Sequence, residues 1–124
     1  MQVIVADKAP AAIGPYSAAM AIDKLVFLSG QTPIVPHSGQ LAEGGIVEQT
    51  EQVIKNLGAV LEAAGSGLDK VIKTTCFLTD MGDFAAFNEV YARYFVSKPA
   101  RSTIAVKALP KNASVEIELI AYRD

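Results

Sequence analysis

The chain has 124 residues, 51% of them hydrophobic and 19% charged, so it can bury a core, and we expect one domain over residues 1–124. The formal net charge of −2 and the lack of a basic run argue against a nucleic-acid partner. The single cysteine excludes an intrachain disulfide, and one cysteine with one histidine does not suffice for a zinc site. Without a signal-peptide pattern or an apolar run of membrane-spanning length, the sequence predicts a cytoplasmic protein that makes no membrane contact.

The first segments predict an edge strand followed by a stiff loop. Residues 2–5 form a short apolar run, whereas residues 9–17 contain two prolines and a glycine and are therefore irregular. Tyr16 directly follows a Gly-Pro pair, which restricts the direction of its ring. This side chain either covers the core or borders a site.

Residues 17–22 and 25–30 predict the two strands of a hairpin, joined by a two-residue turn. The second strand is apolar on both of its faces, which is unusual for a hairpin strand that has one face in water. Ser29 and Gly30 end this strand. They form either an ordinary strand end or a hydroxyl and an open backbone N–H that a ligand can approach.

The clearest helix is predicted over residues 46–64, where apolar residues recur with a period of 3.6 and Gly65 can end the helix. A strand over residues 71–79 follows, and its even-numbered residues from 72 to 78 are expected to form one face. Cys76 belongs to that face. We interpret it as a small buried core residue, because no neighbouring group in the sequence would stabilise its thiolate.

A second helix is predicted over residues 84–96, with Asp83 as its N-cap residue. Asn88 lies within the apolar stripe of this helix. Because an amide on an apolar face must find hydrogen-bond partners, Asn88 either ties down a neighbouring loop or points into a polar site beneath the helix.

The last two strands carry the most informative charges. Pro99 stops the second helix, so Arg101 lies at the start of a strand expected over residues 101–107. Its guanidinium is either a solvated surface charge or a planar hydrogen-bond donor for a carboxylate or phosphate. Glu116 lies opposite the core face of a strand expected over residues 114–122, either on a wet sheet surface or in a site. Since a short turn joins these strands, we expect them to pair antiparallel and to bring Glu116 towards Arg101.

The predicted order of elements is β-β-β-α-β-α-β-β, an α+β fold with one mixed sheet and two helices packed on one face. Two helices cannot cover both faces of a sheet this wide. A homo-oligomer that buries the second face is the simplest way to cover it.

Six short segments, spread over nearly the whole chain, carry a shared pattern. They are PAAIGPYS at 10–17, SGQTP at 29–33, KTTCFL at 73–78, Asp83-Phe84 with Asn88, PARS at 99–102, and Leu109-Pro110 with EIE at 116–118. Together they resemble the RidA/YjgF/YER057c/UK114 family. The combination of Ile-Gly-Pro-Tyr with Pro-Ala-Arg-Ser is specific, whereas either motif alone is weak.

The resemblance implies a chorismate-mutase-like fold and a homotrimer with a ligand cleft at each subunit interface. It implies that the protein hydrolyses 2-imino acids such as 2-iminobutanoate and 2-iminopropanoate, the tautomers of enamines, to 2-keto acids and ammonia. Enzymes dependent on pyridoxal phosphate, such as threonine dehydratase, release these reactive intermediates. No metal or organic cofactor takes part in the reaction of such proteins.

The resemblance also implies roles for individual residues. Arg101 would grip the substrate carboxylate, Glu116 would orient or deprotonate water and return a proton to ammonia, and Tyr16 would close over the substrate. Polar contacts would come from Ser29, Gly30, Asn88 and Thr103. Several relatives have a cysteine where this chain has Thr103, so a thiol nucleophile is not available at that position.

Two other classes of function remain open. One is a non-catalytic module that binds small carboxylates or acts like a chaperone. The other is a ribonuclease or translation inhibitor, which the acidic charge balance disfavours.

Overall fold

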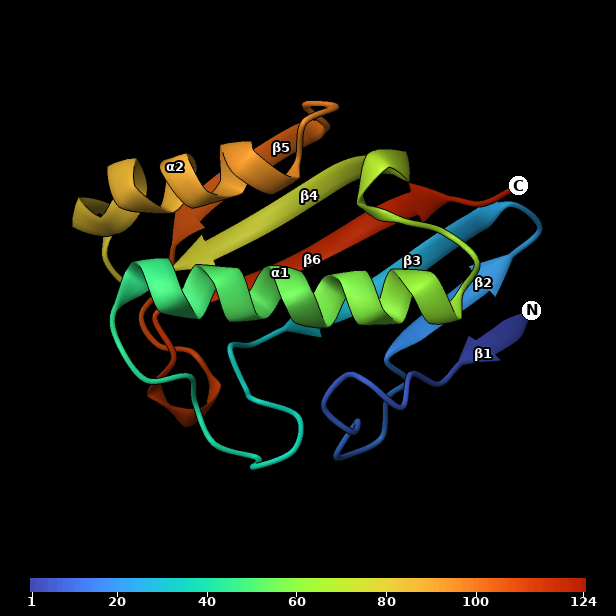
Figure 1. Ribbon diagram of the computed structural model, residues 1–124, viewed down its shortest axis with the longest axis horizontal. Helices are drawn as coiled ribbons and strands as arrows, with labels where there is room; N and C mark the ends of the chain where they lie inside the picture. The colour runs from blue at the N-terminus through green and yellow to red at the C-terminus, as the bar shows by residue number, and fades with distance from the viewer.

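The computed structural model describes all residues from 1 to 124, with one six-stranded mixed sheet and two long helices on one of its faces (Figure 1). The strand order across the sheet is β1-β2-β3-β6-β4-β5. The predicted order of elements and the α+β class are confirmed. The strands are β1 Gln2–Ile4, β2 Ala19–Ile22, β3 Leu25–Gln31, β4 Val71–Leu78, β5 Ala100–Ala105 and β6 Val115–Tyr122, and the helices are α1 Ile46–Ala63 and α2 Phe84–Tyr94.

The hairpin of β2 and β3 turns at Asp23 and Lys24, as predicted. Asp23 has a φ of 51°, a left-handed conformation that Asp tolerates better than most residues. The first strand of this hairpin, β2, begins at Ala19 and not at the predicted Ser17. The Ser17 carbonyl instead accepts a hydrogen bond of 2.6 Å from the Ser29 hydroxyl, which ties the preceding loop to β3.

The strand β3 contains a β-bulge where it pairs with β6. Leu28 lies opposite Leu119 and Gln31 lies opposite Ile117, so two residues of β3 stand against one residue of β6. A bulge bends its strand and changes the direction of the side chains within it. It falls at the Ser29-Gly30 pair, which was a candidate for the site.

A second irregularity corrects the predicted core face of β4. Its pairing with β6 slips between Val71 and Lys73, so Val71 is buried and Ile72 is 44% exposed. The prediction that residue 72 faces the core is therefore wrong. The even-numbered residues 74–78 are buried as predicted.

The strand β5 lies at the edge of the sheet and pairs only with β4, in the parallel direction. The strand β6 lies on the other side of β4 and runs antiparallel to it. The expected antiparallel pairing of β5 with β6 is therefore wrong. The helix α2 is a crossover that returns the chain to the start of β4, which makes β5 parallel to β4, and the connection over residues 106–114 is long enough to pass the end of β4.

The core lies between the sheet and the two helices. The helix α1 contributes Val53, Leu57 and Leu61, α2 contributes Phe87, and Phe95 follows directly after α2; all are almost fully buried. Cys76 of β4 is fully buried in this core, in agreement with its interpretation as a core residue. Nowhere does a helix combine the length and hydrophobicity that crossing a membrane requires.

The face of the sheet away from the helices is called the open face below. The strand register places Val3, Met20, Phe27 and Ile120 in one row across four strands of this face. A neighbouring row adds further large apolar side chains, namely Ile22, Leu25 and Tyr122. As predicted, the helices of the chain cover one face of the sheet and leave this one uncovered.

Asn56 of α1 provides a test of how the loop after β3 is held. Its Nδ2 donates hydrogen bonds to the carbonyls of Thr32 (3.1 Å) and Ile34 (2.8 Å), and the residue is 1% exposed. We expect Asn56→Leu to lower the free energy of unfolding by about 1–3 kcal/mol, because two partly buried carbonyls lose their hydrogen-bond donor. Urea unfolding at fixed protein concentration measures this. Lys55→Leu, at the exposed neighbouring position, is the control, and equal losses in both variants would contradict the expectation.

Candidate active site

One candidate group of residues surrounds Arg101, at the start of β5. Arg101 Nη1 donates a hydrogen bond of 2.7 Å to Oδ1 of Asn88 on α2. Its Cζ lies 4.8 Å from the centre of the Tyr91 ring and 5.6 Å from that of the Phe84 ring. The arginine is nevertheless exposed. These four residues form what is called the arginine cluster below.

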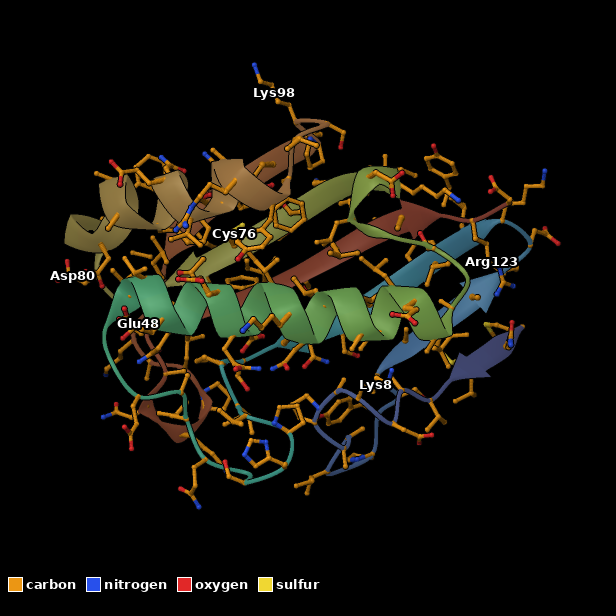
Figure 2. The ribbon with its side chains drawn as sticks, viewed as in Figure 1. Lys8, Glu48, Cys76, Asp80, Lys98 and Arg123 are labelled. Atoms are coloured by element: carbon orange, nitrogen blue, oxygen red, sulfur yellow. The ribbon has the colours of Figure 1, made fainter.

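A cavity of about 500 Å³ adjoins the arginine cluster. Its wall is formed by the end of α2 and the turn before β5, with Asn88, Tyr91, Ala92, Phe95, Val96, Lys98, Pro99 and Arg101. Lys98 projects from this turn away from the body of the molecule (Figure 2). The guanidinium is therefore held on one side and accessible on the other, as a small anion requires.

Buried hydroxyls lie beneath the arginine cluster. Tyr91 OH and Thr74 Oγ1 share a hydrogen bond of 2.7 Å inside the core. Thr103 points to the same side of the sheet as Arg101, and its Oγ1 is buried without a hydrogen-bond partner. Burial raises the pKa of the neighbouring Cys76 thiol, which favours an inert protonated side chain.

A second candidate group lies on β3, β6 and the N-terminal loop. The Glu116 side chain passes directly over Gly30, since a Cβ added at Gly30 would collide with its carboxylate. The Ser29 hydroxyl donates a hydrogen bond to the Ser17 carbonyl, and this bond holds the loop that carries Tyr16. A cavity of about 450 Å³ is bordered by both Tyr16 and Gly30. The four residues Tyr16, Ser29, Gly30 and Glu116 are called the glutamate cluster below.

The electrostatic surroundings of Glu116 favour its protonated form. Partial burial raises the pKa of the carboxyl above its ordinary value, and the nearby charge of Glu118 raises it further. A raised pKa makes the Glu116 carboxylate a stronger base than an ordinary one, which suits a group that takes a proton from water.

The two clusters lie on opposite faces of the sheet. Arg101 is in register with Thr74, whose side chain points to the helices, whereas Glu116 is in register with Phe77. Successive residues of a strand point to opposite faces, so Phe77 and Glu116 face away from the buried Cys76 and from the helices. The structure therefore brings Glu116 to Gly30, which borders the same cavity as Tyr16, and Asn88 to Arg101, but one chain does not bring Arg101 and Glu116 together.

The strand order, the two helices on one face and these two clusters define a small α+β protein with a polar cluster on each face of its sheet. Residues 6–123 match the family model described as Endoribonuclease L-PSP. The chain therefore belongs to this family, which is the RidA/YjgF family, as its sequence pattern suggested.

Curated relatives match the chain along nearly its whole length. The 2-iminobutanoate/2-iminopropanoate deaminase of Mus musculus is 52% identical over 98% of this chain and 91% of its own. The protein of the same name from Homo sapiens is 48% identical over 98% of this chain and 90% of its own.

Solved structures confirm the expected chorismate-mutase-like fold. RidA from an Antarctic Psychrobacter bacterium is 46% identical, with a TM-score of 0.94 over 98% of this chain and 99% of its own. E. coli TdcF with bound serine is 38% identical, with a TM-score of 0.95 over the whole of both chains.

Sequence reasoning missed the two aromatic members of the arginine cluster. Neither Phe84 nor Tyr91 is among the site residues that the sequence predicts. Their spacing from Asn88, four residues before it and three after it, places all three on one helix face and was the available signal.

Gly30→Ala tests the contact between β3 and Glu116. The new Cβ would displace the carboxylate, which is the end of a flexible side chain, so we expect the fold to persist. Deaminase activity of the kind named for the relatives should fall by at least about tenfold, as for a displaced general acid–base group. Gly58→Ala is the control, because a Cβ at Gly58 meets open space on α1. Unchanged turnover in Gly30→Ala would show that the position of the carboxylate is unimportant.

Proposed function

We propose that this chain is an enzyme that hydrolyses 2-imino acids, with 2-iminobutanoate and 2-iminopropanoate as substrates, to 2-keto acids and ammonia. The observation that carries the proposal is the exposed Arg101 guanidinium, held by Asn88 and open to a cavity. A guanidinium presented in this way binds a carboxylate through two parallel hydrogen bonds. The names of the mouse and human relatives and the serine bound to E. coli TdcF, itself a small carboxylate, support the same assignment.

The complete site forms between two copies of the chain in this proposal. The arginine cluster of one copy faces the glutamate cluster of the next, because a single chain holds them on opposite faces. The apolar rows of the open face supply the surface for assembly, and a homotrimer with three such sites is the arrangement we propose.

The chemistry follows from the charge of the substrate. Arg101 holds the carboxylate, and the protonated imine carbon is electrophilic without further activation. Glu116 takes a proton from water as the oxygen bonds to that carbon, which gives a carbinolamine. The carboxyl then returns the proton to nitrogen, and the resulting Glu116 carboxylate takes the hydroxyl proton as the carbon–nitrogen bond breaks. The departing ammonia carries that proton away as ammonium, and the 2-keto acid leaves. Tyr16 covers the substrate, and the Gly30 N–H, Ser29, Asn88 and Thr103 provide further polar contacts around it.

The proposed substrates arise where enzymes dependent on pyridoxal phosphate eliminate a group from an amino acid and release an enamine. We place the protein beside such dehydratases in the cytoplasm. The chain itself would use neither a metal nor an organic cofactor, since water, proton transfer and orientation suffice for this hydrolysis.

Arg101→Ala should lower kcat/KM for a 2-imino acid by about a hundredfold, because a charge-assisted pair of hydrogen bonds is lost. Arg101→Lys keeps the charge but loses the two-pronged geometry, so its kcat/KM should lie between those of the wild type and Arg101→Ala. A coupled assay in which an amino-acid oxidase supplies the imine measures both. Full turnover in Arg101→Ala would contradict the proposal, and 2-keto acid binding without turnover in the wild type would indicate the non-catalytic module instead.

Mixing two inactive variants tests whether the site is shared between copies. Arg101→Ala retains Glu116, and Glu116→Ala retains Arg101, so about one quarter of the interfaces in a randomly mixed assembly regain both groups. Activity should therefore reappear after the two variants are unfolded together and refolded. The absence of any recovery, with intact mixed oligomers, would place the whole site within one chain.

The pH profile tests the role of Glu116 as the base. Activity should fall as the pH drops through the pKa of Glu116, because the protonated carboxyl cannot accept a proton. Glu118 raises that pKa, so Glu118→Gln should move the acidic limb to lower pH. Glu62→Gln on α1 makes the same change of charge at a distant exposed position and should leave the limb in place. A limb that stays or moves upward in Glu118→Gln would contradict this role.

A further inference from the structure

We propose that Tyr91 is a positioning residue for carboxylate capture: its ring, fixed from below by Thr74, sets the plane in which Arg101 presents its guanidinium. This inference rests on the proposed function and assigns to Tyr91 a role beyond core packing.

The first support is the geometry around the guanidinium. Its Cζ lies closer to the centre of the Tyr91 ring (4.8 Å) than to that of the Phe84 ring (5.6 Å). Asn88, between them on the same face of α2, accepts a single hydrogen bond from Nη1. A guanidinium has five N–H donors in one plane, so a ring near its face and one amide at its edge leave most donors free. The free donors are those that a carboxylate needs.

The second support is the rigidity of the Tyr91 ring. Its hydroxyl shares a buried hydrogen bond of 2.7 Å with Thr74 Oγ1, and its ring stacks on Phe95 with centroids 4.3 Å apart. Thr74 is also the residue of β4 in register with Arg101. One position of β4 therefore holds both the backbone of the arginine and the ring beneath its side chain, which fixes their relative orientation.

The third support is the neutral character of everything that holds Arg101. Its hydrogen-bond partner is an amide, its other neighbours are aromatic rings, and the one salt bridge of the chain joins Lys70 to Asp124. A carboxylate in the place of Asn88 or Tyr91 would compete with the substrate for the guanidinium. Aromatic support orients the cation without neutralising it.

The role predicts a specific kinetic signature. Loss of the ring frees the guanidinium to adopt other rotamers, so the carboxylate of substrate and product binds more weakly, while the chemistry at Glu116 is unaffected. We expect Tyr91→Leu to raise KM for the 2-imino acid and Kd for the 2-keto acid by about fivefold or more, with little change in kcat.

Two matched variants separate positioning from packing. Tyr91→Phe keeps the ring and its stacking on Phe95 but loses the hydrogen bond to Thr74, and should recover most of the lost affinity. Phe87→Leu removes a ring that also packs on Tyr91, with centroids 5.6 Å apart, but the rings at the Arg101 guanidinium are those of Phe84 and Tyr91, so KM and Kd should rise much less than in Tyr91→Leu. If Tyr91→Leu does not fold, Tyr91→Met, which fills more of the same space, takes its place.

The measurements are KM and kcat from the coupled assay and Kd from calorimetry with 2-oxobutanoate. Equal increases of KM in Tyr91→Leu and Phe87→Leu, or a fall of kcat at constant KM, would overturn the inference and leave Tyr91 a core residue. If the wild type binds 2-oxobutanoate but turns over no imine, the proposed function is wrong, and the Kd values alone still decide the role of Tyr91. If the wild type binds no carboxylate, both are wrong.

Discussion

The parallel pairing of β5 with β4 determines the side of the sheet from which Arg101 acts. In that register Arg101 lies beside Thr74, so its side chain emerges under α2 at the edge of the helix layer. Antiparallel pairing of β5 with β6 would have brought Glu116 next to the strand of Arg101. With β4 inserted between the two strands, the guanidinium and the carboxyl point to opposite faces of the sheet, and in the proposed function each cluster needs the other to complete the site.

A second, independent feature supports the proposed assembly. The open face carries rows of large apolar side chains from β1, β2, β3 and β6, and the two helices lie on the other face (Figure 1). Covering these rows with further copies of the chain would remove apolar surface from water. The same contacts would bring the arginine cluster of one copy to the glutamate cluster of another. Stability of the oligomer and completion of the site are therefore linked in the proposed assembly.

Local patterns in the sequence were sufficient for the elements themselves. The 3.6 period predicted α1, Gly65 ends it with a φ of 80°, and the turn at Asp23 was placed correctly. Asn88, for which two roles were open, bonds to Arg101 and not to a loop. What failed was non-local. The pairing partner of β5 depends on the direction of the crossover through α2, and the shifted register at Val71 has no signature in the residues around it.

The same limit explains why the sequence did not reveal that Arg101 and Glu116 lie on opposite faces of the sheet. Whether two residues share a face depends on strand order and on every bulge between them, since a slip of one residue reverses the face. The sequence pattern places Arg101 near the start of one strand and Glu116 within another. It does not show that a third strand lies between these two in the sheet. The grouping of Tyr16 with Gly30 likewise depends on the bond from Ser29 to the Ser17 carbonyl, which links segments distant in sequence.

The neutral surroundings of Arg101 have a consequence for the rate at which ligands arrive. An arginine without a counter-ion keeps its field directed into solvent, and such a field draws small anions towards it by diffusion. Association should then slow as ionic strength rises and the Debye length shortens. For a molecule that decays within a short lifetime, frequent encounters matter more than long residence, and an uncompensated cation at the entrance meets that demand.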